Sequence, residues 1–128
     1  MKKTCMTVCL GLGLAFGAGA EPTSFPDGTS ASPAAELNEF VKDKVFTTTR
    51  SDGVAGRFNY RSDGKFEIFY QRSGSTTKEF GGWRAEDGKL CVDDPVNGKA
   101  CNEVRVQGAN LYYKRNSNGQ VLALTPAQ

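Results

Sequence analysis

Turn dipeptides divide the chain from Val45 onward into short segments of similar length. Each dipeptide joins a polar residue to a glycine: Asp52-Gly53, Asp63-Gly64, Ser73-Gly74, Asp87-Gly88, Asn97-Gly98 and Asn118-Gly119. Such pairs tolerate the positive φ angles that tight hairpins require. The segments between them are therefore expected to be strands of an antiparallel meander.

These segments also alternate apolar and polar residues. Phe58 and Tyr60 alternate with polar neighbours in one segment, and Phe66, Ile68 and Tyr70 do so in the next. A period of two gives each strand one apolar face. The same pattern predicts later strands at 76–80, 82–85, 90–92, 102–106, 111–114 and 121–124. A flat sheet of this size would expose long edges, so we expect a mainly β fold: a small antiparallel β-barrel or a strongly curved meander sheet of seven to nine strands.

One short helix is predicted before the strands. Ser32 is suited to be its N-cap, and Pro33 is suited to the first helical position, where its missing N–H costs nothing. Leu37 and Val41 follow with helical spacing on one apolar stripe. We expect an amphipathic helix over 34–43 that lies against the sheet.

The first twenty residues have the three-part layout of a secretory signal peptide. Lys2 and Lys3 precede an apolar run over 8–16, and small residues up to Ala20 supply a cleavage site. The run is shorter than the roughly 20 residues that cross a bilayer. We expect a signal peptide over 1–20, a flexible lead-in over 21–32 and a single β-rich domain over 33–128, in a periplasmic or secreted protein without membrane insertion after cleavage.

Removing this leader changes the charge balance. The chain contains 16 Lys and Arg against 14 Asp and Glu, and the leader holds Lys2 and Lys3 but no acidic residue, which leaves 14 against 14. A neutral chain with interspersed charges lacks the basic footprint that binds phosphate backbones or anionic lipid. Nucleic acid and membrane surfaces are therefore not expected partners.

Two of the four cysteines, Cys5 and Cys9, leave with the leader, so Cys91 and Cys101 remain. An even pair in an oxidising compartment favours a disulfide over metal binding or catalysis. The two residues are also too far apart in sequence for the Cys-x-x-Cys motif of redox enzymes. We expect a structural disulfide that contributes about 2 to 3 kcal/mol to stability.

Catalytic and metal-binding motifs are weak in this chain. It has no histidine, which excludes Ser-His and Cys-His dyads and histidine-ligated zinc. Paired carboxylates remain for glycoside hydrolysis, although acids between Lys and Arg on strand surfaces are usually cross-strand partners. The candidates are Glu67, Glu79, Glu86 and Glu103.

A calcium site is also not expected. Asp93, Asp94 and Asn97 cluster between the cysteines and offer oxygen ligands. They lack the ligand order of an EF-hand, and turn chemistry explains the same residues. We therefore expect no metal and no cofactor.

The densest signature lies over 80–92. A Gly-x-Trp, a turn, Leu-Cys-Val and a second cysteine resemble small secreted proteobacterial proteins of domain-of-unknown-function families, over about 44–124. The anchors are Phe58-Asn59-Tyr60, Asp63-Gly64, Gly82-Trp83, Leu90-Cys91 and Cys101. That resemblance implies no settled activity. Gly81-Gly82-Trp83 is also similar to the Gly-x-Trp of lipocalins, whose barrels enclose apolar ligands.

The expected function is that of a non-catalytic, exported binding module of the bacterial cell envelope. It would hold a small apolar or saccharide ligand or dock a protein. The aromatic residues that would line a cavity are Trp83, Phe58, Tyr60, Phe66 and Tyr70. A large aromatic residue such as Trp83 is more often a plug or core residue of a small domain than part of a ligand site. Two alternatives are a secreted inhibitor of a hydrolase such as lysozyme, which would present the loop 93–99, and a carboxylate-dependent hydrolase.

Overall fold

The structure is a computed structural model that describes residues 21–127. The predicted signal peptide, with Cys5 and Cys9, lies outside the described residues. Within them the elements in chain order are α2 (Ala34–Val41), β1 (Lys44–Thr49), β2 (Ala55–Tyr60), β3 (Lys65–Arg72), β4 (Ser75–Glu86), β5 (Lys89–Asp94), β6 (Gly98–Gln107), β7 (Asn110–Lys114) and β8 (Val121–Pro126).

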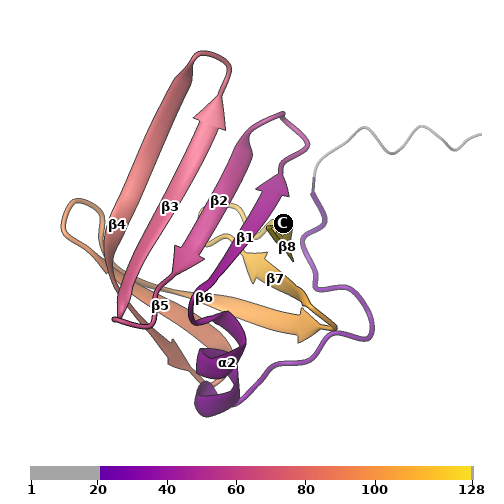
Figure 1. Cartoon of the computed structure of the whole chain (residues 1–128). Helices are drawn as coiled ribbons and strands as arrows, with labels where there is room; N and C mark the ends of the chain where they lie inside the picture. The colour runs from indigo at the N-terminus through magenta and orange to yellow at the C-terminus, as the bar shows by residue number, and fades with distance from the viewer. Residues whose placement is uncertain (1–20, 128) are drawn as a thin grey trace, which may run out of the picture.

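These eight strands of the described chain form a closed antiparallel barrel (Figure 1). Each strand pairs with the next, and β8 returns to pair with β1 at Phe46 and Thr47. The predicted barrel of seven to nine strands with one short helix is confirmed. The six predicted turn glycines all have positive φ, and Gly108 makes a further turn, between β6 and β7, that was not predicted.

The connections alternate between two ends of the barrel. The β2–β3, β4–β5 and β6–β7 turns lie at the end that carries α2, the helix end, and the other four hairpins surround the open end. Figure 1 shows α2 beneath the barrel and the β3–β4 hairpin projecting at the opposite end. Leu37 and Val41 of α2 are fully buried, so the helix closes its end of the barrel.

The helix start differs from the prediction. Pro33 is the N-cap residue in place of Ser32, and it makes no side-chain cap hydrogen bond. The N–H of Ala34 instead donates to the carboxylate of Asp87 in the β4–β5 turn, at 2.8 Å. The helix also ends at Val41, two residues earlier than the sequence predicts. A tertiary contact therefore supplies the cap that the local sequence was expected to provide.

The lead-in over 21–32 is hydrogen-bonded to the barrel. Ser30 and Val106 exchange two backbone hydrogen bonds, of 3.1 and 2.9 Å, and the N–H of Val121 donates to the carbonyl of Pro22. Figure 1 shows the segment passing beside β7 on its way to α2. It ties the chain that leads into the helix to β6 and β8.

Strand β4 is continuous over 12 residues, although the sequence predicted separate strands at 76–80 and 82–85. It pairs with β3 up to Gly82 and with β5 from Gly82 onward. A Cβ at Gly81 would overlap the carbonyl oxygen of Asp93, so only glycine allows β5 to approach there. The glycine pair marks the corner where β4 changes partners, not a strand end.

The interior of the barrel is filled by side chains. Aromatic and aliphatic residues from the helix and from every strand except β4 contact one another and are almost fully buried. They are Leu37, Val41, Phe46, Phe58, Tyr60, Phe66, Ile68, Leu90, Val104, Leu111, Leu122 and Leu124. This packed core reaches toward the open end, where polar residues replace it.

Candidate functional site: the open end of the barrel

A hollow of about 210 Å³ lies above the core at the open end. Five of its lining residues come from different elements: Tyr70 of β3, Glu79 of β4, Asn102 of β6, Tyr113 of β7 and Arg115 just after β7. We call these five residues the mouth cluster. A second hollow, of about 380 Å³, shares Tyr70, Glu79 and Arg115 with the first. The mouth cluster thus borders one broad polar depression.

Strand alternation positions this cluster. Ile68 and Tyr70 are two residues apart on β3, and Glu79 lies directly opposite Ile68 on β4, so all three belong to the inward face. The buried ring of Phe58 contacts both tyrosines edge-on, with centroids 6.0 Å from Tyr70 and 5.3 Å from Tyr113. Phe58 therefore packs against both tyrosines from within the core, and Ile68 provides an apolar floor in the hollow itself.

Two neighbouring carboxyl groups in this depression have opposite character. Burial raises the pKa of Glu79, and the negative charge of Asp94 raises it further. Burial also opposes ionisation of Asp94, but hydrogen bonds from the N–H groups of Val96 and Asn97 and from the Asn97 amide lower its pKa. Within residues 21–127 Glu79 makes no hydrogen bond or ion pair. Asp94 is engaged by its own turn, whereas Glu79 keeps unused acceptor capacity.

The tyrosines of the site are held in their neutral form. Burial raises the pKa of Tyr70 to about 12, and it raises the pKa of Tyr113 as well. For both phenols the charge of Glu79 acts in the same direction and that of Arg115 acts against it. Among the described residues neither Glu79 nor Arg115 has an ion-pair partner within 4.0 Å. Two neutral phenols thus share the depression with a carboxyl group and a guanidinium that have no ion-pair partner among the described residues.

Of the five aromatic residues named from the sequence, Tyr70 is the one that borders the open end. Phe58, Tyr60 and Phe66 are buried in the core. Trp83 is half-buried and packs edge-on against Tyr60, with ring centroids 5.5 Å apart. Its Nε1–H donates to the carbonyl of Arg61 in the β2–β3 turn, at 2.8 Å. This contact places Trp83 at the helix end, where it acts as a plug.

Sequence reasoning missed Arg115 and Asn102 as site residues. Asn102 follows Cys101 on β6 and Arg115 lies just after β7, and neither residue belongs to a motif that indicates binding. Only barrel closure brings them beside β3 and β4. For Tyr113 the sequence does hold a signal, because its alternation with Leu111 places both side chains on one face of the strand. Glu79 was a candidate by residue type alone, and its inward register comes from the structure.

The remaining candidate glutamates lie elsewhere. Glu67 pairs with Lys78 at 3.3 Å and Glu86 with Arg84 at 2.9 Å, both on the outer face of the sheet. Glu103 is exposed on β6. Of the four, Glu79 is the one that reaches the open end.

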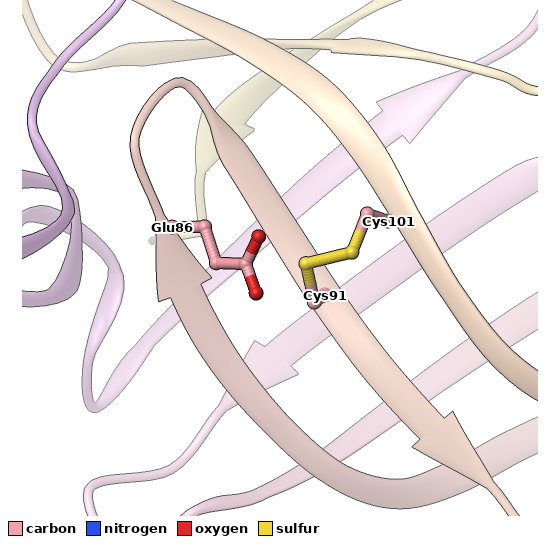
Figure 2. A group of neighbouring side chains, drawn as sticks. All are labelled: Glu86, Cys91 and Cys101. Atoms are coloured by element: carbon pink, nitrogen blue, oxygen red, sulfur yellow. A yellow bond between two sulfur atoms is a disulfide. The ribbon is translucent and has the colours of Figure 1, made fainter.

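Cys91 and Cys101 lie directly opposite each other on β5 and β6, with Cα atoms 4.0 Å apart, and form a disulfide. Figure 2 shows the Glu86 carboxylate directed toward this bridge. Because each sulfur is bonded to the other, neither offers a thiolate, so these three residues do not make a metal site. A disulfide of this kind is typical of an oxidising, exported compartment.

The chemistry of the mouth cluster is that of polar recognition. It offers a carboxylate acceptor, a guanidinium donor and phenols that both donate and accept.

Within residues 21–127 no helix has the length and the apolar composition to cross a membrane. No protein family, no curated protein and no solved structure matches this chain.

Proposed function

We propose that this protein is an exported, non-catalytic binding module whose open barrel end holds a saccharide or a similar hydroxyl-rich small molecule. One observation carries the proposal. Among the described residues the carboxylate of Glu79 and the hydroxyls of Tyr70 and Tyr113 have no hydrogen-bond partner, although all three line one depression. Convergent polar groups over an apolar floor are the usual make-up of a small-ligand site.

Saccharide hydroxyls both donate and accept hydrogen bonds, so one ligand can satisfy unlike groups. They can donate to Glu79, accept from Arg115 and exchange bonds with the phenols. The 210 Å³ hollow is smaller than the roughly 300 to 1,000 Å³ typical of drug-sized pockets. This size favours a single sugar unit in the hollow, with the rest of the ligand lying over the adjoining depression.

An apolar ligand inside the barrel is less favoured than a polar ligand at its mouth. Phe58, Ile68 and Leu122 occupy the central space with almost no exposure. A lipocalin-like cavity would require several such side chains to move away. The filled core therefore supports a ligand that lies above it.

The hydrogen bonds that Asp94 accepts favour binding of a saccharide without its hydrolysis. Glu79 and Asp94 have the pKa contrast of an acid and a nucleophile in a glycosidase. Hydrogen bonds from Val96 and Asn97, however, engage both carboxylate oxygens of Asp94. Because its own turn occupies both oxygens, Asp94 would have to release a hydrogen bond before it could attack a sugar, so we expect no reducing sugar to be released.

The binding test compares single-site variants in calorimetric titrations with N-acetylglucosamine, glucose and short cell-wall oligosaccharides. Tyr113→Phe, Glu79→Gln and Arg115→Gln should each weaken binding about 3- to 10-fold, as expected for loss of one hydrogen bond. Arg57→Gln, on the outer face of β2, is the matched control and should leave the affinity unchanged. Absence of saccharide binding at millimolar concentration, or equal affinity for all variants, would overturn the proposal.

Export is supported by the Cys91–Cys101 disulfide and has its own test. Expression in a bacterial host should yield a periplasmic or secreted product that begins at Glu21. N-terminal sequencing of the fractionated protein checks this. A product that retains Met1 and stays with the cytoplasm would contradict it.

The hydrolase-inhibitor alternative rests on the β5–β6 turn. Val96 is 81% exposed at its tip, and the buried carboxylate of Asp94 holds the turn rigid. Pre-organised, protruding loops suit insertion into an enzyme cleft. Inhibition of lysozyme that is lost in Val96→Ser would favour this alternative over saccharide binding.

A further inference from the structure

Strand β4 has an unpaired edge at the open end. Its residues 75–80 pair with β3 alone, because β5 joins β4 only at Gly82. Within the described chain no backbone hydrogen bond satisfies the far side of this stretch. Figure 1 shows the β3–β4 hairpin projecting beyond its neighbours. Unpaired edges are templates for strand addition.

The hydrogen-bond pattern between β3 and β4 shows which backbone groups of β4 point toward the free edge. The N–H of Trp83 donates to the carbonyl of Gly64 at 2.9 Å, just outside the Lys65–Gly82 pair. In an antiparallel ladder this marks that pair as non-hydrogen-bonded, and the two pair types alternate along the strands. The residues of β4 whose backbone N–H and C=O face the free edge are therefore Thr76, Lys78 and Phe80.

Exposed apolar side chains flank this edge. Phe80 and Val96 are 48% and 81% exposed, and they are the exposed large apolar residues of the described chain. Phe80 and Pro95 both line a hollow of about 450 Å³ on the outer face, above the glycine corner at Gly81. Charged residues such as Lys78 and Glu67 also line this hollow. A pocket for a side chain next to free backbone groups is the arrangement that peptide-binding sheet edges use.

We infer that this edge binds an extended segment of another protein as an added antiparallel strand. The segment carries a basic residue flanked by apolar residues. Its apolar side chains lie on the outer face, opposite Lys78 and Phe80 and beside Val96. Its basic side chain lies on the inner face, opposite Glu79.

The carboxylate of Glu79 is the reason why we expect a basic residue in the bound segment. Among the described residues Glu79 has no cationic partner, and Asp94 adds a second negative charge nearby. Side chains of a non-hydrogen-bonded pair approach most closely, and Glu79 forms such a pair with an added strand. A cation opposite Glu79 is therefore well placed to neutralise its carboxylate. By contrast, Lys78 already has Glu67 at 3.3 Å.

A second copy of this chain fits the edge less well. If two copies pair antiparallel along the whole stretch 76–80, the pairing is centred on Lys78. It sets the two Lys78 side chains directly opposite each other, which is unfavourable in a sheet. The same lysine protects the edge against self-association.

The test uses an acetylated and amidated peptide, Thr-Val-Arg-Val-Thr, titrated into the full-length, isotopically labelled protein. Amide shifts should concentrate at residues 76–80. N-methylation of both valines should abolish binding, because their N–H groups face β4, whereas N-methylation of the arginine should leave it intact. Replacing the peptide's arginine with glutamate should weaken binding about tenfold or more.

Protein variants separate this edge from the saccharide site. Lys78→Pro removes one outward N–H, and Val96→Ser removes an apolar contact; both should weaken peptide binding while saccharide binding persists. Lys99→Ser, in the same hairpin as Val96, is the matched control.

Three results would overturn the proposal: no peptide binding at millimolar concentration, equal binding of both methylated peptides, or a dimer that Lys78→Pro dissociates in sedimentation. The last would make the edge a self-interface. The methylated peptides need no mutation, so the test holds even if a variant fails to fold.

Discussion

The carboxylate of Asp87 accepts a hydrogen bond of 2.8 Å from the N–H of Ala34, 53 positions earlier in the chain. The first N–H groups of a helix lack partners inside the helix, so an outside acceptor stabilises them. The N–H of Gly88 also donates to the carbonyl of Ser32, at 2.8 Å. The β4–β5 turn therefore caps α2 and fastens the helix to the barrel.

Replacing Asp87 tests this cap. Asp87→Ala should lower the free energy of unfolding by about 1 kcal/mol, the usual cost of losing a side-chain cap. Asp87→Asn keeps an acceptor oxygen and should cost much less. Urea unfolding followed by circular dichroism measures both. Equal stability of the alanine variant and the wild type would show that the contact does not stabilise the helix.

The glycine corner of β4 gives a matched pair of substitutions. Gly81→Ala should destabilise the protein by about 2 to 4 kcal/mol, because its Cβ overlaps the Asp93 carbonyl and its φ is positive. Gly82→Ala should cost less than about 1 kcal/mol, since its Cβ would lie 3.7 Å from the nearest other atom, the Gly64 carbonyl oxygen. Thermal unfolding of both variants measures the difference. Similar losses in the two would contradict a close approach specific to Gly81.

Tyr60 carries a buried hydroxyl without a hydrogen-bond partner among the described residues. A buried and unsatisfied polar group costs free energy, so Tyr60→Phe should raise the free energy of unfolding by about 1 kcal/mol. The hydroxyl of Tyr113 lines the open hollow, so Tyr113→Phe should change stability by less than about 0.5 kcal/mol. Denaturant midpoints compare the two, and a destabilised Tyr60→Phe would indicate a hydrogen bond to bound water.

Stability should depend on pH through Glu79. Burial and Asp94 raise the pKa of Glu79 in the folded state above its ordinary value of 4.5. A raised carboxyl pKa favours folding while the group is protonated, and that advantage is lost as the pH rises through the folded-state pKa. Glu79→Gln stays neutral, so its stability relative to wild type should increase between about pH 3 and pH 7. Urea unfolding at both pH values measures this, and a constant difference would contradict it.

Much of the fold was predictable because its information is local. Alternation in segments such as 65–71 and positive-φ glycines such as Gly64 specify strands and hairpins without distant contacts. The Cys91–Cys101 disulfide was also predictable, because the predicted leader contains Cys5 and Cys9 and leaves an even pair. The errors concerned contacts between distant segments: the cap from Asp87 and the continuity of β4 through Gly81.

The candidate site shows the same division between what local sequence predicts and what contacts between distant segments decide. Aromatic identity pointed to Phe58 and Tyr60, yet a filled barrel buries both. Glu79, Tyr113 and Arg115 meet because closure of β1 against β8 brings β4 and β7 to one rim. No local sequence pattern predicts that these three residues lie close together.

The sequence by itself determined most of the strands, six of their turns, the Cys91–Cys101 disulfide and the absence of histidine chemistry. These depend on backbone preference and residue type, which act over a few positions. Only the tertiary structure decided that the barrel is filled, that its polar groups gather at the open end and that β4 keeps a free edge. Those features depend on packing volume and on strand length relative to neighbours, which are set when all eight described strands close together.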